Sequence, residues 1–515
     1  MGFQLRLDTL SAGRLVSFSN VAIIFFLFCL VRLVQSLLKR TSLPPLPPGP
    51  PRIPLIGNVF NMPKEKAWET FANWRSSYGD VVSLNGLGQH VIILNSYEAV
   101  HSLLDKKGTL YAHRPEFRML LLGGLGNLIL AMSNTPAFRY RRKLIHQSFG
   151  TPSATTAYYS GIEAEVRRLI KGLFEAPSEF KDHIEHASSG IILRAAYGFV
   201  NVPQSLTSEI EAGMGMLSEA AIPTAYLINF IPWMRHLPSW LPGTGFRRLA
   251  NNMNKTLVGV SDTAFNMVKQ NMTQGSVEAS YTSRLIEKGE DDEIVKWTAI
   301  QLYGGIAGTV IGFFKAMTLY QDAQARAQQE IDTVIGNDRL PSFSDRGELP
   351  YCEALILEVF RWHCVAPNGV PHRLLEDDIY QGMRIPAGSF VIPNAWGISK
   401  DPSLYKDPDK FEPLRFLSDG GFSEQAPEQD PRAYVFGHGR RVCAGQALAE
   451  ASMFLEMVTV LSLFNISRYV DAEGVIDEPS TEMLPGLISF PCPFNCSIKP
   501  RNAAAEALLR ANIME

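Results

Sequence analysis

The sequence predicts one large, mainly α-helical domain that carries small β-sheets and follows an N-terminal transmembrane helix. Three observations lead to this prediction. Apolar residues recur at helical spacing over long stretches, for example 162–173, 248–270 and 293–335. Short β-rich runs interrupt these stretches at 79–95 and 382–398. One proline-rich linker lies near the N-terminus, and neither a second linker nor an internal repeat follows it.

The composition fits a large buried core and gives no sign of a nucleic-acid partner. Of the 515 residues, 46% are hydrophobic and 19% are charged, and the formal net charge is -3. A nucleic-acid binder would need a basic stripe, which this charge balance does not predict. Six cysteines in a chain of this length do not indicate a disulfide framework. Cys492 and Cys496 could pair or bind a metal, but no second Cys/His pair lies nearby.

The first expected element is a membrane anchor. Residues 21–38, VAIIFFLFCLVRLVQSLL, are long and apolar enough to cross a bilayer, and Arg32 can reach the interface from its C-terminal end. The alternative is a cleaved signal peptide, but the segment ends in basic residues instead of small ones. A slight excess of positive residues after the span predicts a single-pass anchor, residues 1–41, with the domain 59–515 in the cytosol.

Two further segments follow from local composition. SLPPLPPGPPRIPLIGN, residues 42–58, is expected to be a stiff hinge, because proline favours extended backbone. In residues 79–95 two β-rich runs flank Gly86 and Gly88, which predicts a hairpin. Residues 221–243 are apolar and aromatic although prolines interrupt them. They form either ordinary core and loop or a surface segment that enters the membrane interface.

Cys443 lies in VFGHGRRVCAGQALAE, residues 435–450, after two arginines and before a predicted helix. A buried structural cysteine would not need glycines at 437, 439 and 445. A nucleophile needs a nearby base, which the sequence cannot locate, and a metal ligand needs the thiolate. Adjacent arginines and helix N-terminal amides lower the pKa of a thiol, and glycines let the backbone approach a flat, bulky group. Such a thiolate suits the axial position of haem iron.

The spacing of this segment resembles the haem-binding signature of the cytochrome P450 family. The pattern F-x-x-G-x-R-x-C-x-G is met by Phe436, Gly439, Arg441, Cys443 and Gly445, which makes the match specific. The resemblance implies haem b as cofactor, with Cys443 as the axial ligand of the iron. It also implies that Arg441 binds a haem propionate, that Phe436 packs near the sulfur and that Gly445 belongs to the cofactor site.

Two more motifs follow the order that the family requires. Glu358 and Arg361 form E-x-x-R, whose two side chains share one face of a helix and can pair. Pro413, Arg415 and Phe416 form P-x-R-F further along the chain. The resemblance makes Glu358, Arg361 and Arg415 a buried ion network that supports the haem pocket.

The remaining matches concern the haem propionates and the kind of family member. NTPAFRYRRKLIHQSF resembles the family's W-x-x-x-R helix, with Phe138 in place of tryptophan and Arg142 at the propionate-binding position. His372 lies at another position that contacts a propionate in the family. The resemblance extends from about residue 20 to 500 and is strongest to fungal, microsomal members that build secondary metabolites.

The central helix departs from the family pattern in LYGGIAGTVIGFF, residues 302–314. Alignment on its first residues places Thr309 at the threonine beside oxygen and Gly308 where an acid is usual. Alignment on residues 313–320 indicates that about three residues are missing between Val310 and Phe313, and Gln321 replaces a proline. A bulge or shift must absorb the loss, unless the gene was read incorrectly. Proton delivery would then run through Thr309 and water.

The resemblance implies a monooxygenase that inserts one oxygen atom from O2 into a lipophilic small molecule. Because no dinucleotide-binding unit is visible, electrons are expected from a separate NADPH-dependent flavoprotein reductase, with cytochrome b5 as an optional donor, at the endoplasmic reticulum membrane. Residues 117–132 and 367–370 are expected to contact an apolar substrate, and Arg440 is expected to face solvent or the redox partner. The alternatives are an isomerase, dehydratase or peroxygenase that needs no external electrons, and a non-catalytic haem binder.

Overall fold

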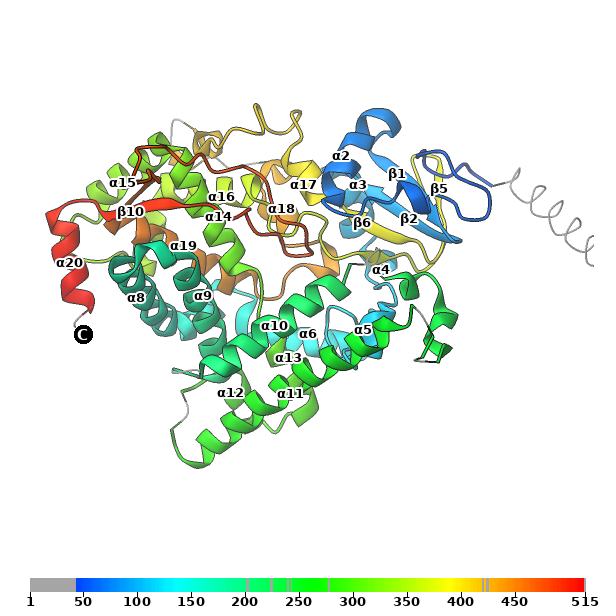
Figure 1. The fold of residues 1–515 in the computed structure, drawn as a ribbon, viewed down its shortest axis with the longest axis horizontal. Coiled ribbons are helices and arrows are strands. Elements are labelled where there is room, and N and C mark those ends of the chain that lie inside the picture. Colours follow the sequence, from blue (N-terminus) through cyan, green and yellow to red (C-terminus); the bar gives the residue numbers. More distant parts are fainter. Residues whose placement is uncertain are drawn as a thin grey trace, which may run out of the picture. The chain divides into compact units, whose positions relative to one another are not determined.

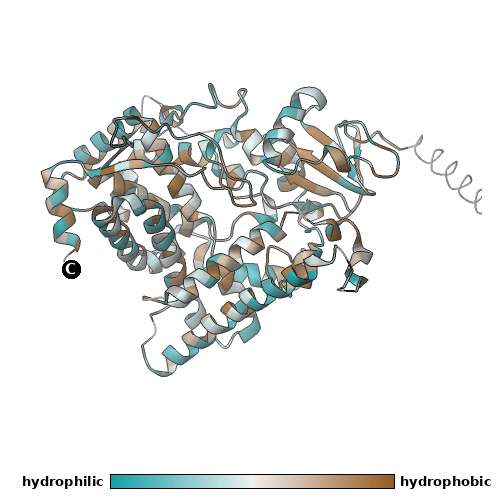
Figure 2. Ribbon diagram, viewed as in Figure 1, coloured by the Kyte–Doolittle hydropathy of each residue, from teal (hydrophilic) through white to brown (hydrophobic). Residues whose placement is uncertain are grey.

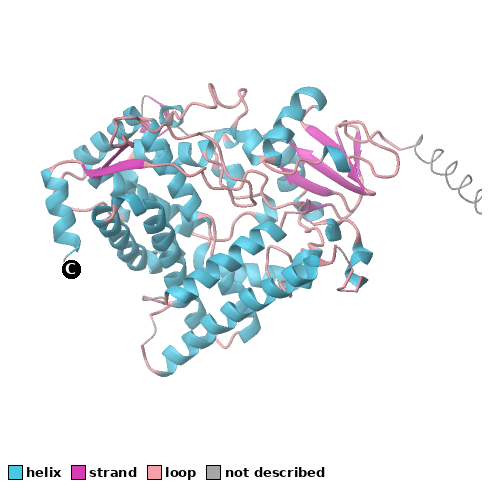
Figure 3. Cartoon of the chain, viewed as in Figure 1, coloured by secondary structure: helices cyan, strands magenta, loops and turns pink. Residues whose placement is uncertain are grey.

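The structure is a computed structural model that divides into two compact units. One unit comprises the chain up to Leu46 together with Asp378–Ile385, and the other comprises Pro47–Asp377 and the chain from Pro386 onward. The predicted anchor, residues 1–41, lies outside the described residues. Helices predominate, and the strands form small sheets (Figure 3). The residues described are 43–513, apart from 201–202, 223–225, 239, 242, 277, 419–420 and 423–425.

The described part of the first unit is a small hairpin and a short segment beside it. Strands β4 (Asp378–Tyr380) and β5 (Met383–Ile385) pair antiparallel. The Arg384 N–H donates to the Pro45 carbonyl oxygen at 2.8 Å, which joins the segment to the hairpin.

The second unit contains a four-stranded sheet in the order β1-β2-β6-β3. The hairpin predicted over 79–95 is confirmed, because β1 and β2 pair antiparallel through a turn in which Leu87 and Gly88 have positive φ. Strand β6 adds parallel to β2, with Val91 opposite Phe390. The strands are largely hydrophobic (Figure 2). They are β1 (Val81–Gly86), β2 (Gln89–Leu94), β6 (Phe390–Pro393) and β3 (His372–Arg373).

Helices make up most of the second unit (Figure 1). The helices expected over 162–173 and 248–270 are present as α8 and α11. The larger helices are α2 (Ala67–Tyr78), α6 (Pro136–Phe149), α8 (Tyr159–Glu175), α9 (Phe180–Tyr197), α10 (Gln204–Ala220), α11 (Gly245–Thr273), α13 (Asp292–Ile300), α14 (Ile306–Leu319), α15 (Gln321–Val334), α16 (Pro350–Trp362), α19 (Gln446–Leu463) and α20 (Ala503–Ile513). The shorter ones are α3 (Tyr97–Val100), α4 (Gly108–Tyr111), α5 (Arg118–Leu122), α7 (Pro152–Thr155), α12 (Tyr281–Glu287), α17 (Ala395–Ser399) and α18 (Arg432–Val435).

Helices α14, α16 and α19 form the centre of the core and are buried over most of their length. Helix α19 is long and apolar enough to cross a membrane, but 72% of it is buried inside the protein. Burial on all sides explains its composition, since a helix that is apolar all round belongs in the core of a large protein or in a membrane. Strands β9 (Phe464–Arg468) and β10 (Cys496–Pro500) pair antiparallel after it.

The second half of the expected proline-rich hinge packs onto the domain. The Ser83 N–H of β1 donates to the Pro48 carbonyl oxygen at 2.8 Å, and the Asn58 side chain donates to the Pro50 carbonyl oxygen at 3.0 Å. A Cβ atom on Gly49 would lie 2.2 Å from the Ser83 carbonyl oxygen, so only glycine allows this approach. Residues 47–58 are therefore bound along β1, and the proline-rich segment does not extend as a free spacer over this half.

Candidate active site

Residues 436–445, here called the Cys443 loop, connect α18 to α19. The Cys443 N–H donates to the Phe436 carbonyl oxygen at 2.7 Å, which closes the loop. Gly439 has a φ of +51°, and a Cβ atom there would lie 2.3 Å from the Leu104 carbonyl oxygen. A Cβ atom on Gly445 would meet nothing within 4 Å. The glycines therefore serve different needs: Gly439 admits a neighbouring backbone, whereas Gly445 leaves open space beside the thiol.

The Cys443 side chain is exposed, although the surrounding protein is dense. Desolvation by that protein raises the pKa of the thiol. The Gly445 backbone N–H and the charge of Arg142 oppose that rise without reversing it. Positive charge and a backbone amide thus lower the pKa of Cys443 as expected, but the source of the charge is Arg142, and desolvation of the thiolate outweighs both contributions.

Helix α6 brings two side chains to this loop. Thr135 caps the helix by accepting from the Phe138 N–H at 3.2 Å, and a proline occupies its first position. From α6, the Arg142 guanidinium donates to the Val442 carbonyl oxygen. The Arg441 guanidinium lies over the Phe138 ring, 3.7 Å from its centroid. Phenylalanine in the tryptophan position thus holds Arg441 through a cation–π contact.

Arg441 and a third arginine are anchored by backbone carbonyl groups. Arg441 donates to the carbonyl oxygens of Ala112 at 2.7 Å and Met132 at 2.6 Å. Arg114 is buried and donates to the carbonyl oxygens of Val370 at 2.6 Å and Pro371 at 2.8 Å. The sequence motifs did not indicate Arg114, because its neighbours come from segments about 250 residues away.

These arginines form a positive cluster that has no carboxylate partner among the described residues. Burial lowers the pKa of Arg114, Arg142 and Arg441, that of Arg441 to about 9. The positive charges of Arg441 and Arg142 lower the pKa of Arg114 further, and the charge of Arg142 does the same for Arg441. Several buried guanidinium groups without counter-ions are costly, and a ligand with carboxylates would relieve that cost. The donor set therefore fits the two propionates of haem, beside a thiol that faces open space.

Two other predicted haem contacts have defined positions. His372 is buried, and its Nδ1 atom lies 2.9 Å from the Tyr111 carbonyl oxygen. Burial, with the nearby positive charge of Arg114, keeps the pKa of His372 well below its usual value, so the ring is neutral. Phe436 packs edge-on against Phe360 of α16, with ring centroids 5.5 Å apart, and its carbonyl group binds the Cys443 amide.

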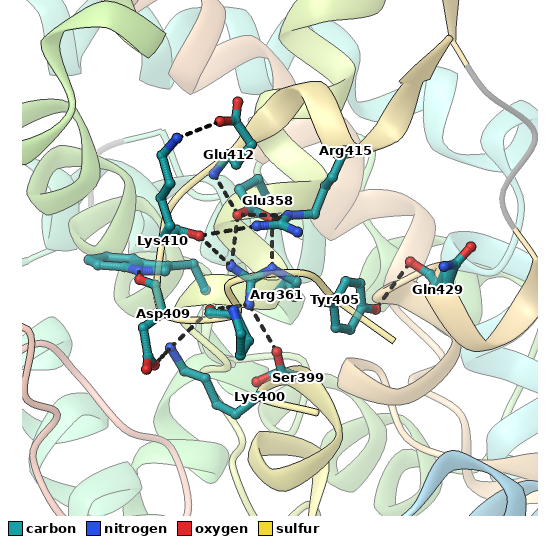
Figure 4. A network of polar contacts seen from close by, with 12 residues as sticks. Glu358, Arg361, Ser399, Lys400, Tyr405, Asp409, Lys410, Glu412, Arg415 and Gln429 are labelled. Carbon is teal, nitrogen blue, oxygen red and sulfur yellow. Dashed lines mark hydrogen bonds and ion pairs between the residues drawn. The ribbon is translucent and has the colours of Figure 1, made fainter. Parts of the chain in front are cut away.

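Glu358, Arg361 and Arg415 form one buried ion network (Figure 4). Two guanidinium nitrogens of Arg361 donate to Glu358 at 2.7 Å each, and both residues are fully buried. The Arg415 Nε atom lies 3.2 Å from Glu358, and the Glu412 N–H donates to the same carboxylate at 2.7 Å. Arg361 also donates to the Ser399 carbonyl oxygen at 2.9 Å. The network therefore ties α16 to the chain that leads toward the Cys443 loop.

The helix predicted over 293–335 is divided into α13, α14 and α15, so a single continuous helix is wrong. The first break lies at 301–305 and contains Gly304 and Gly305. Helix α14 then runs unbroken from Ile306 to Leu319, so the interval between Val310 and Phe313, where a bulge or shift was expected, is regular helix. The second break is at Tyr320, where the Gln321 side chain donates to the Ile466 carbonyl oxygen at 2.8 Å.

Gly308 and Thr309 both lie on the buried side of α14. The Thr309 hydroxyl is directed at the Gly305 carbonyl oxygen, 3.4 Å away. A Cβ atom on Gly308 would approach a Val365 methyl group to 3.0 Å, which is a tight contact. An acidic side chain at this position would therefore require Val365 to move.

Three segments meet the break between α13 and α14. Gln301 accepts from the Ile129 N–H at 2.7 Å, which holds the predicted substrate loop 117–132. A Cβ atom on Gly305 would lie 3.5 Å from both Val365 and Ile488. The sequence did not indicate the segment around Ile488, since its apolar residues carry no motif. The predicted segment 367–370 is fixed separately, by the Trp396 N–H that donates to the Pro367 carbonyl oxygen at 3.0 Å.

Comparison with known proteins agrees with the motifs. The sequence model described as Cytochrome P450 matches residues 47–487. The chain is 39% identical to cytochrome P450 monooxygenase claR from Ampulloclitocybe clavipes, over 97% of this chain and 94% of that protein. It is 38% identical to cytochrome P450 monooxygenase 208 from Postia placenta, over 89% and 90%. It is 36% identical to cytochrome P450 monooxygenase ppsD from Aspergillus oryzae, over 94% of each chain.

These matches cover nearly the whole chain and include every motif described above. Family members carry haem iron, use redox partners and act on apolar substrates in general. The chain therefore belongs to the cytochrome P450 family and is an oxidoreductase of the monooxygenase type.

Proposed function

We propose that the protein is a haem-thiolate monooxygenase that inserts one oxygen atom from O2 into a lipophilic small molecule. The observation that carries this proposal is the exposed Cys443 thiol near the half-buried Arg142, which belongs to a cluster with the buried Arg114 and Arg441. None of the three arginines has a carboxylate partner among the described residues. A haem b group would bind through Cys443 and place its propionates at Arg142 and Arg441. Arg114 and His372 would complete the same polar side of the pocket.

Other residues would shape this site. Phe436 would pack beside the sulfur, and Gly445 would leave room for the macrocycle. The Glu358–Arg361–Arg415 network would support the pocket at the C-terminal end of α16, where Phe360 packs against Phe436. When bound, haem supplies the oxygen chemistry, which the axial thiolate favours by donating electron density.

Thr309 would serve proton delivery together with ordered water. Gly308 has no acidic side chain, so a hydroxyl and a chain of waters would have to carry the proton. The same feature supports a second candidate function, a haem-thiolate enzyme that needs no external electrons. The two candidates differ in one measurable respect, since only the monooxygenase requires NADPH and a reductase for turnover.

The substrate is proposed to be an apolar intermediate of secondary metabolism. The support is the apolar character of residues 117–132 together with the similarity to fungal monooxygenases. Buried Leu125 and Leu128 lie in this loop, and Ile129 is fixed to Gln301 by its amide. Apolar residues around a bound ligand would suit a hydrocarbon-rich molecule.

Electrons would come from an NADPH-dependent flavoprotein reductase at the endoplasmic reticulum, with cytochrome b5 as an optional donor. Arg440 of the Cys443 loop is exposed and would meet the partner. The protein would be a single-pass membrane protein, with residues 1–41 as anchor, 42–58 as a linker whose second half packs along β1, and 59–515 as the cytosolic domain. Within 221–243, the exposure of Trp233 (62%) and Trp240 (78%) supports contact with the membrane interface.

The central test is a carbon-monoxide difference spectrum of the reduced holoenzyme. Thiolate ligation gives a distinctive red-shifted band, which is expected for the wild type and for the control variant Cys492→Ala. Cys443→Ala should lose that band. A wild type without the band, or an unchanged spectrum in Cys443→Ala, would refute the proposed ligand. Turnover with and without NADPH and reductase then separates the two candidate functions.

A further inference from the structure

The segment before α4, residues His101–Lys106, makes a close backbone approach to the Cys443 loop and a hydrogen bond with it. Residues His101–Lys106 form a short π-helix that follows α3. The Leu104 carbonyl oxygen lies where a Cβ atom of residue 439 would be, which is why that residue is glycine. π-helical turns are rare and occur often at functional sites.

Asp105 of this π-helix binds the Cys443 loop directly. The Gly439 backbone N–H donates to the Asp105 Oδ1 atom at 2.6 Å. The other carboxylate oxygen, Oδ2, lies 3.1 Å from the Nδ1 atom of His101, whose ring stacks on Tyr97 with centroids 5.5 Å apart. The carboxylate is therefore oriented by one contact and binds the loop with the other.

This hydrogen bond lies at a point of the loop that is connected to Cys443. Gly439 begins the 3-10 helix Gly439–Arg441, and its carbonyl oxygen accepts from the Val442 N–H at 3.3 Å. Val442 immediately precedes Cys443, and its own carbonyl oxygen accepts from Arg142. The orientation of the Gly439 backbone therefore affects Val442, the residue next to Cys443, through this one hydrogen bond.

We propose that Asp105 is a positioning residue for the Cys443 loop, acting through the Gly439 amide to hold Cys443 in the geometry that binds iron. This proposal rests on the proposed haem-thiolate function. A carboxylate suits the task because hydrogen bonds to charged groups are stronger than those between neutral ones. His101 assists by orienting the second oxygen of the carboxylate.

The test compares two substitutions at one position. Asp105→Asn keeps an oxygen acceptor for the Gly439 amide, whereas Asp105→Ala removes it. Glu98→Ala is the matched control, since Glu98 is an exposed acid in α3, on the same segment of chain. The first readout is hydrogen exchange at the Gly439 amide in the full-length holoenzyme. The second is the fraction of bound haem that gives the red-shifted carbon-monoxide band.

In Asp105→Ala, exchange at the Gly439 amide should accelerate roughly tenfold or more, as loss of a hydrogen bond to a charged group predicts. The red-shifted fraction should fall in the same variant. Asp105→Asn should restore most of both signals, and Glu98→Ala should match the wild type. If Asp105→Ala does not fold, His101→Ala provides the measurement, with a smaller change expected in the same direction.

Wild-type exchange in Asp105→Ala would overturn the proposal, and so would faster exchange with an undiminished red-shifted band. Equal losses in Asp105→Asn and Asp105→Ala would also overturn it, because the acceptor oxygen would then have no part. A wild type that lacks the band would instead refute the haem-thiolate function, while the exchange data would still report on the Asp105 contact.

Discussion

Glu456 provides the sharpest prediction about stability. It lies on α19, is fully buried, and neither of its carboxylate oxygens has a hydrogen-bond partner in the part of the chain that the structure describes. Burial raises the pKa of Glu456 to about 8. The negative charge of Glu165 on α8 also raises this pKa. The nearby Ser188 hydroxyl lowers it, although the hydroxyl does not form a hydrogen bond of normal geometry. The side chain is therefore mostly protonated at neutral pH, unlike an ordinary carboxylate.

The sign of the pH dependence follows from proton binding. Between pH 4.5 and about 8, the native state keeps a proton on Glu456 that the unfolded chain releases. The free energy of unfolding must therefore fall as pH rises through this window. At pH 7 the gap between pH and the unfolded pKa is about 2.5 units, which corresponds to roughly 3 kcal/mol. Above pH 8 the loss reaches its full value of roughly 5 kcal/mol.

The proposed variant is Glu456→Gln, which has nearly the same shape and cannot ionise. Unfolding entropy is about 2 cal/mol/K per residue, or about 1 kcal/mol/K for a domain of roughly 470 residues. The variant should therefore melt close to the wild type at pH 5, about 3 °C higher at pH 7 and roughly 5 °C higher at pH 8.5. Thermal unfolding of both proteins across pH 5–9 measures the difference.

Both the control and the refuting result compare the melting temperature of a variant with that of the wild type at each pH. Glu175→Gln changes an exposed glutamate on α8 and should show no pH-dependent difference from the wild type. A difference between Glu456→Gln and wild type that stays constant from pH 5 to pH 9 would mean that Glu456 ionises normally. The claim that burial keeps it protonated would then be wrong.

Three further outcomes are expected from the packing. Arg361→Ala should cost about 3–5 kcal/mol and reduce haem retention, because it leaves Glu358 charged and buried; thermal unfolding and the haem-to-protein absorbance ratio check this. Gly439→Ala should destabilise the protein and diminish the carbon-monoxide band, because the added Cβ atom would clash with the Leu104 carbonyl oxygen. The control is Gly474→Ala, which has positive φ but nothing within 4 Å of its Cβ position, so it should cost about 1 kcal/mol through backbone strain alone. Lys315→Met should stabilise at pH 7, because burial lowers the pKa of Lys315 to about 8 and the folded protein then holds a protonated, desolvated amine. This gain should shrink as pH rises from about 8 to 10.5, where the native state has released a proton that the unfolded chain still binds. Unchanged stability in any of these variants would contradict the corresponding packing argument.

The central helix shows where sequence reasoning reached its limit. Helical periodicity over 293–335 correctly predicted helices, but it predicted a continuous one. Periodicity reports which residues are apolar, and α13 and α14 both remain apolar on either side of the break. The site of the break depends on packing: Gln301 binds Ile129, and Gly308 packs against Val365. These partners lie far away in the chain, so no local signal contained them.

The Cys443 loop shows the same division more clearly. The sequence alone determined the family, the mainly helical fold and the motif around Cys443, because motifs with fixed spacing and helical periodicity are local properties. Only the tertiary structure decided which arginines surround the thiol and what each glycine is for. Asp105 binds the loop from a distant segment, and the charge of Arg441 in the loop acts on Arg114. Charge clusters and close backbone approaches are long-range contacts, and they exist only once the chain has folded.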